Sequence, residues 1–142
     1  MRRRGDRGSA LMLMPAAVLI MFVLGAIAVD LTAIRVGQRD LQAALTDAAN
    51  DAVTGALDES LLRAGSGYQV DRSMAWMIAM SALETRGALR DVVDGPHITV
   101  AEDGSVTISA SRRVPHIFGR ALPGVPHHET VRATATAHLE RR

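Results

Sequence analysis

The sequence predicts an α+β protein: a long N-terminal helix that spans a membrane over its first half, a second helix, and a three-stranded antiparallel sheet. Apolar residues recur every three or four positions in the first two thirds of the chain, which is the period of a helix. In the last third they alternate with polar residues, as in a half-buried strand. Near the N-terminus lies an uncharged apolar run of a length that soluble helices seldom contain.

The apolar run extends from Ala10 to Val29 and contains twenty uncharged residues. As a helix with ~1.5 Å of rise per residue it is ~30 Å long, about the thickness of the hydrocarbon core of a bilayer. Pro15 is compatible with this, since membrane-spanning helices tolerate a kink. We therefore expect a transmembrane helix over 10–29, with Arg7 and Asp30 marking the membrane boundaries.

The distribution of arginine predicts the orientation of this span. Four arginines lie in the basic segment 1–9, whereas only Arg35 and Arg39 lie in the twenty residues after the run. By the positive-inside rule, residues 1–9 stay in the cytoplasm and residues 30–142 form an extracytoplasmic domain of a single-pass cell-membrane protein. The alternative is a signal peptide over residues 1–28, cleaved after Ala26-Ile27-Ala28. The helical pattern continues beyond that site, which favours the retained anchor.

The helical pattern then runs from Leu31 to about Ala64, where Gly65 and Gly67 are expected to end it. One face of this predicted helix carries an apolar stripe rich in alanine. Because alanine lets a neighbouring backbone come close, we expect this stripe to pack on the chain's own sheet or on a partner helix. The stripe consists of residues at helical spacing: Leu41, Leu45, Ala48, Ala52 and Ala56.

A second helix is predicted from Val70 to Val93. Asp71 or Ser73 can cap its start, and Asp94-Gly95-Pro96 is expected to stop it. Its centre, residues 74–80, is apolar on every side, which predicts a buried helix.

The last third predicts three strands. Alternating residues on both sides of Asp103-Gly104 indicate a hairpin over 97–112 that turns at this dipeptide. A third strand is expected from Thr130 to Leu139, with one apolar and one polar face. The link from Pro115 to Pro126 contains prolines and glycines, but also Ile117, Phe118 and Leu122, so we expect a short turn of helix packed over the edge of the core.

Composition and motifs favour a protein without catalytic activity. The net charge is +1 and there is no cysteine, so neither nucleic-acid binding nor a thiolate metal site or nucleophile is indicated. His127-His128-Glu129 resembles a metal cluster, but adjacent residues of an extended chain point to opposite sides, which predicts an exposed polar loop. We expect no catalytic, cofactor-binding or metal-binding residue, no cofactor and no small-molecule substrate. Asp30 is interpreted as an interfacial residue, with an ion pair to another subunit's arginine as the alternative.

Several short segments together resemble one known family. The layout is similar to that of the TadE/TadG-like components of tight-adherence (Flp) pilus assembly systems, in their actinobacterial forms, most clearly over residues 7–57. The segments that carry the resemblance are Arg7-Gly8-Ser9-Ala10, Ala28-Val29-Asp30-Leu31, Gln38-Arg39-Asp40-Leu41-Gln42, Asp47-Ala48-Ala49-Asn50-Asp51-Ala52 and Val131-Arg132-Ala133-Thr134-Ala135.

The resemblance implies a minor pilin or pilus-assembly subunit at the cell surface, with membrane lipid and other subunits of the apparatus as partners. Prepilin-like members of the family carry a glutamate five residues after the processing glycine, but counting from Gly8 this chain has Leu13 there. The difference favours a permanently anchored, TadG-type role over a repeating pilin. The rival interpretation is a small secreted or membrane-anchored domain that binds a ligand at the link from Pro115 to Glu129.

Overall fold

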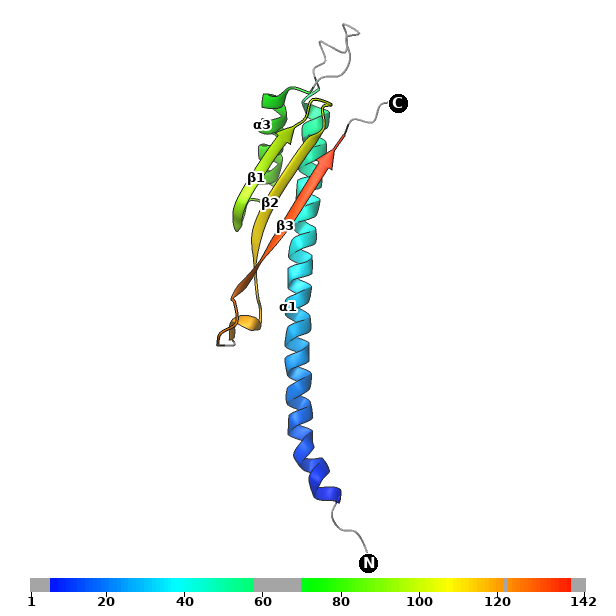
Figure 1. Ribbon diagram of the computed structural model, residues 1–142, viewed down its shortest axis with the longest axis vertical. Helices are drawn as coiled ribbons and strands as arrows, with labels where there is room; N and C mark the ends of the chain where they lie inside the picture. Colours follow the sequence, from blue (N-terminus) through cyan, green and yellow to red (C-terminus); the bar gives the residue numbers. More distant parts are fainter. Residues whose placement is uncertain (1–5, 58–69, 122, 139–142) are drawn as a thin grey trace, which may run out of the picture.

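The computed structural model describes residues 6–57, 70–121 and 123–138, with side chains from residue 13 onward. It confirms the predicted α+β arrangement of a long N-terminal helix, a second helix and a three-stranded antiparallel sheet (Figure 1). In chain order the elements are α1 (Asp6–Gly55), α3 (Arg72–Thr85), β1 (Val92–Val100), β2 (Val106–Pro115), the 3-10 turn η1 (Gly119–Ala121) and β3 (His128–Ala137).

Helix α1 is 50 residues long and has two different environments. Its N-terminal half stands clear of the other elements, and its C-terminal half lies along the sheet (Figure 1). Apolar side chains of the free half are exposed, for example Met21 at 74% and Phe22 at 73%. By length and composition this helix fits either a single membrane span or a signal sequence.

The sheet has the strand order β1-β2-β3 and is antiparallel throughout. Pairing of β2 with β3 is unbroken from Val106 opposite Ala137 to Pro115 opposite His128. The predicted hairpin is confirmed: β1 and β2 are joined by residues 101–105, and Gly104 has a φ of +81°, which glycine adopts without strain.

The stripe, which follows α1 and ends at Ala56 directly after the helix, forms the centre of the core. Its five residues are 0–1% exposed and face the sheet and α3, so the stripe packs within its own chain. The Gln42 side chain adds a polar contact between α1 and β3, in which Nε2 donates to the carbonyl of Thr134 at 2.9 Å. The sheet contributes one face of small and β-branched residues to the core. The buried sheet residues on this face include Val106, Ile108, Ala110, Val131, Ala133, Ala135 and Ala137.

The second helix ends eight residues earlier than predicted, at Thr85 instead of Val93. The chain leaves it through a Schellman motif, in which the N–H of Gly87 donates to Glu84 O and the N–H of Ala88 donates to Leu83 O, both at 2.9 Å. Gly87 has a φ of +64°, which such a helix end requires. In the sequence this glycine does not stand out as a helix end, because the apolar pattern continues beyond it.

Consequently the predicted stop signal lies inside a strand. Val92 and Val93 belong to β1, and Asp94-Gly95-Pro96 follows them in the part of β1 where the register with β2 shifts. A Cβ at Gly95 would lie 2.8 Å from Ser109 O, so this glycine allows the two strands to approach despite the irregularity.

Helix α3 is buried on one face only, so the prediction of a helix buried on every side is wrong. Asp71 is the N-cap: its carboxylate accepts from Ser73 Oγ, Ser73 N and Met74 N at 2.6–3.0 Å. These hydrogen bonds, that of the Ser73 hydroxyl foremost, lower the pKa of Asp71. Ala75, Ala79 and Leu83 are buried, whereas the opposite face is 43–56% exposed at Met74, Trp76 and Met77.

Two further boundaries differ from prediction. Helix α1 ends at Gly55, where a Cβ would lie 2.9 Å from Ile78 Cδ1, and Leu57 then pairs with Val70 in an isolated bridge. The predicted helix end at residues 64–67 lies outside the described residues. Strand β3 begins at His128 and ends at Ala137; its predicted alternation is confirmed from Val131 onward, and Leu139 lies outside the described residues.

The link between β2 and β3 contains the predicted short turn of helix, η1. The expected packing of the link over the edge of the core is wrong for its apolar side chains. Ile117 and Phe118, which precede η1, are 52% and 49% exposed. Leu122 lies outside the described residues.

Replacing Ala48 with leucine is expected to lower the free energy of unfolding by ~1–3 kcal/mol, because the added volume has no space between helix and sheet. Ala43→Leu is the matched control, since Ala43 lies on the same helix and is exposed; a change within about 0.5 kcal/mol is expected there. The measurement is urea-induced unfolding of the full chain in detergent micelles. Equal effects of the two variants would contradict the assignment of the stripe to the core.

Candidate functional site

Asp30 forms a cluster of hydrogen bonds that joins α1 to the link between β2 and β3. Its carboxylate accepts from the backbone N–H groups of Ile117 at 2.7 Å, Phe118 at 2.9 Å and Gly119 at 2.7 Å. The residue is only 8% exposed, although it directly follows the apolar run. We call Asp30 and these three N–H groups the Asp30 clasp.

The clasp requires a glycine in the link. A Cβ at Gly119 would lie 3.0 Å from Asp30 Oδ2 and 2.9 Å from His116 Nδ1, closer than such atoms normally come. Three successive N–H groups that point at one carboxylate resemble the backbone nests that bind anions in other proteins. Here the anion is a side chain of the same chain.

The surroundings favour the ionised carboxylate. Hydrogen bonds from Phe118, Gly119 and Ile117, together with the nearby imidazole of His116, lower the pKa of Asp30 against the opposing effect of burial. Asp30 therefore keeps its negative charge over the range in which ordinary aspartates are ionised.

His116 lies beside the clasp, with Nδ1 3.7 Å from Asp30 Oδ2. Its Nε2 atom is buried and has no hydrogen-bond partner among the described residues. The side chains of His116 and Asp30 are mostly buried, at 15% and 11% exposed. Nothing local in the sequence signals the contact of His116 with Asp30, which lies 86 positions away.

A pattern for Asp30 was nevertheless present in the sequence. The stripe that begins at Leu41 continues backward at the same spacing through Gly37 and Ile34 to Asp30. Asp30 therefore lies on the face of α1 that meets the domain, although it also directly follows the apolar run. The carboxylate oxygens are both engaged within the chain. The side chain of Arg7, the other predicted boundary residue, lies outside the described ones.

A second attachment lies two helical turns beyond the clasp. Arg112 Nη2 donates to the carbonyl of Gly37 at 2.6 Å, and a Cβ at Gly37 would lie 2.6 Å from Val114 Cγ2. The Val114 side chain of β2 thus packs directly on the backbone of α1, and a larger residue at position 37 would force it to move.

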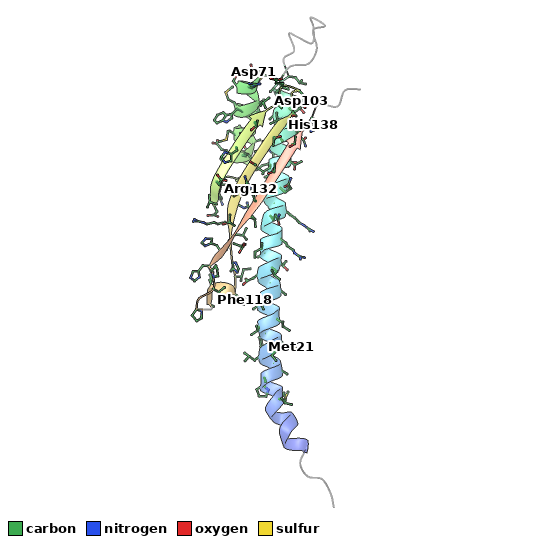
Figure 2. The ribbon with its side chains drawn as sticks, viewed as in Figure 1. Met21, Asp71, Asp103, Phe118, Arg132 and His138 are labelled. Carbon is green, nitrogen blue, oxygen red and sulfur yellow. The ribbon has the colours of Figure 1, made fainter. Side chains whose placement is uncertain are left out.

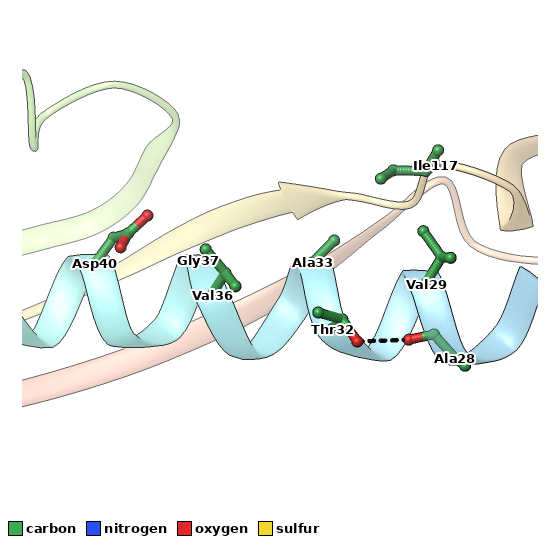
Figure 3. A pocket seen from close by; sticks show the side chains of 8 residues that line it. All are labelled: Ala28, Val29, Thr32, Ala33, Val36, Gly37, Asp40 and Ile117. Atoms are coloured by element: carbon green, nitrogen blue, oxygen red, sulfur yellow. Dashed lines mark hydrogen bonds between the residues drawn. The ribbon is translucent and has the colours of Figure 1, made fainter.

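An open, mostly apolar groove runs along α1 beside the clasp (Figure 3). The hydroxyl of Thr32 donates to Ala28 O at 2.8 Å, so it is already satisfied within the helix. The single charged residue of the groove is Asp40 at its far end. The lining residues are Ala28, Val29, Thr32, Ala33, Val36, Gly37, Asp40 and Ile117.

The other polar candidates remain separate in the structure. His128 and Glu129 are exposed at the start of β3, and within the described ranges no three histidine, aspartate or glutamate side chains gather in a way that would hold a metal. His97 Nε2 lies 3.0 Å from Asp94 Oδ1 in an exposed pair on β1. The groove beside the Asp30 clasp is thus lined mainly by apolar residues.

Comparison of the chain with family models, with curated proteins and with solved structures finds no match.

Asp30→Asn is expected to lower the melting temperature at pH 7. The side-chain NH₂ group of asparagine would replace the oxygen that accepts from the Gly119 N–H, so that two hydrogen-bond donors would face each other. The pKa of Asp30 is lowered in the folded state, so its contribution to stability is present above the ordinary value of about 3.9 and is lost as the pH falls through the lowered value. The difference between wild type and variant should therefore shrink in strong acid.

Thermal unfolding of the full chain in detergent at a series of pH values measures this effect. Asp40→Asn is the control, an exposed aspartate of the same helix, and it should behave as wild type. A wild-type melting temperature for Asp30→Asn at pH 7 would show that the clasp contributes no stability.

Proposed function

We propose that the chain is a non-catalytic, single-pass membrane subunit of a pilus-assembly apparatus, either minor pilin-like or an accessory component. Segment 1–9 would lie in the cytoplasm and residues 30–142 outside the cell. The observation that supports this most is the continuity of α1, one helix of 50 residues that exposes an apolar surface in its first half and forms the core of the domain in its second.

The clasp favours a retained anchor over a cleaved signal peptide. Cleavage after Ala28 would leave Asp30 as the second residue of the mature chain, at a helix end that frays. The three N–H groups of the link would then be held by the least stable turn of the helix. In the intact chain the same aspartate lies in the middle of α1, where helical hydrogen bonds on both sides keep it in place.

The pilus-related role comes from the resemblance of residues 7–57 to TadE/TadG-like proteins, and the architecture is compatible with it. A domain that is rigidly continuous with its span is suited to packing beside other spans in an assembly, because position in the membrane fixes the position of the domain. The rival interpretation places a ligand at the link, but the groove that Ile117 lines beside the described part of the link is open and mostly apolar.

The protein should remain with the membrane fraction after alkaline carbonate washing, because the run from Ala10 to Val29 is long enough to span. Ala28→Leu provides a control, since it blocks cleavage at the only predicted signal-peptidase site. Wild type and variant should fractionate alike. Recovery of a soluble wild-type species that begins at Val29, with the variant membrane-bound, would establish the signal-peptide interpretation.

The proposed membership in a pilus apparatus is tested by purification of the tagged full-length protein from its native host. Co-purification of a pilus ATPase's membrane platform proteins, or of other pilus subunits, is expected for wild type and equally for the His127→Ala/His128→Ala double variant. Failure of wild type to bring down any such component would exclude the pilus proposal. Loss of partners in the histidine variant alone would favour a ligand-binding role for the link.

A further inference from the structure

The link between β2 and β3 lies at the level where α1 would leave the membrane. We propose that this link is a second membrane contact, in which Ile117 and Phe118 insert into the interfacial layer of the leaflet from which α1 emerges. The inference rests on the proposed retention of the span, and it adds a lipid-binding surface to the domain itself.

The depth of the link follows from the clasp. The headgroup layer adds ~5–7 Å to the hydrocarbon core on each side, which corresponds to roughly three to five residues of helix beyond Val29. Asp30 holds the N–H groups of residues 117–119 at this level, and Ile117 lines the same groove as Val29, Thr32 and Ala33. Figure 2 shows Phe118 at the end of the sheet nearest to the free half of α1, above Met21.

Two apolar side chains at this depth, those of Ile117 and Phe118, leave about half of their surface exposed. Ile117 is 52% exposed and Phe118 49%, in a link whose ends are anchored by strand pairing. Aromatic and aliphatic side chains next to a basic residue are typical of segments that lie in the membrane interface. Arg120 supplies the basic residue: it is exposed in η1 directly after Gly119, where its guanidinium can reach lipid phosphates.

The clasp also removes the main obstacle to insertion of a loop. Backbone N–H groups without acceptors are costly in an apolar environment, and irregular segments usually have several. Here Asp30 accepts from three consecutive N–H groups, while those of His116 and Ala121 donate to backbone carbonyls at 3.0 Å. The link can therefore enter the interfacial layer with these donors satisfied.

The groove favours lipid as the occupant of the surface formed by the link and α1. Its apolar wall on α1 begins at Ala28 and Val29, the last residues of the run, so it is continuous with the surface that the span presents to acyl chains. Lipid is thus present at the groove whenever the span is inserted, without a separate binding event.

Tryptophan fluorescence in vesicles tests the proposal. The chain has one tryptophan, Trp76, which is 51% exposed. It lies on α3, which packs beside α1 at the end of the sheet away from the link (Figure 1). In a Trp76→Phe background, Phe118→Trp reports on the link and Phe22→Trp on the span, and both replace exposed side chains. Full-length proteins are reconstituted into phosphatidylcholine vesicles in which the lipid is unlabelled, brominated near the head group, or brominated deep in the acyl chain.

The expected result is a blue-shifted emission at position 118 that shallow bromine quenches more strongly than deep bromine. The reporter at position 22 should be quenched most by deep bromine, and the native Trp76 by neither. Ile117→Trp in the same background is the second link reporter, in case the change at 118 perturbs the fold.

The outcomes separate this inference from the proposed function. Quenching at position 22 without quenching at 117 or 118 would overturn the membrane contact and leave the span intact. Link reporters that are shielded from aqueous iodide but not quenched by brominated lipid would show that protein and not lipid covers the surface, which also overturns the membrane contact. Absence of quenching at position 22 would instead contradict the retained span.

Discussion

The continuity of α1 is the constraint on which the rest of the structure depends, because one helix serves two different surroundings. Its first half leaves apolar side chains uncovered, while its second half is covered by a sheet and by α3. No flexible segment separates the two halves. Every contact that the sheet makes with α1 therefore also sets the position of the domain relative to the free half of the helix.

Small residues determine how the domain attaches to this helix. The stripe on α1 and the facing side of β3 both consist largely of alanine, so helix and strand approach closely but bury little area per residue. Polar attachments supplement this packing at intervals along α1: the Asp30 clasp, the contact of Arg112 with Gly37, and the contact of Gln42 with Thr134. These attachments all join the helix to the sheet or its link, and together they hold the sheet in one register along it.

Elements with a strong local signal were predictable from the sequence. The alternation in β3, the Asp103-Gly104 turn and the stripe on α1 each depend on residues close together in the chain. The end of α3 was predicted wrongly because Gly87 stops the helix through backbone geometry, while the apolar residues that follow belong to β1. The clasp could not be predicted as a contact, since its partners lie 87 to 89 positions apart and the link contributes backbone atoms, which carry no side-chain signature.

The clasp and the Gly37 contact lie seven residues apart, about two turns, and so fall on one side of α1. This spacing restricts how the chain can change in length. One residue added between them would rotate the following helix by ~100° and shift it by ~1.5 Å, so that the link and β2 would no longer meet the same face. Insertions and deletions are thus far more costly in this stretch of α1 than in the surface loops, and relatives of the protein should keep its length unchanged.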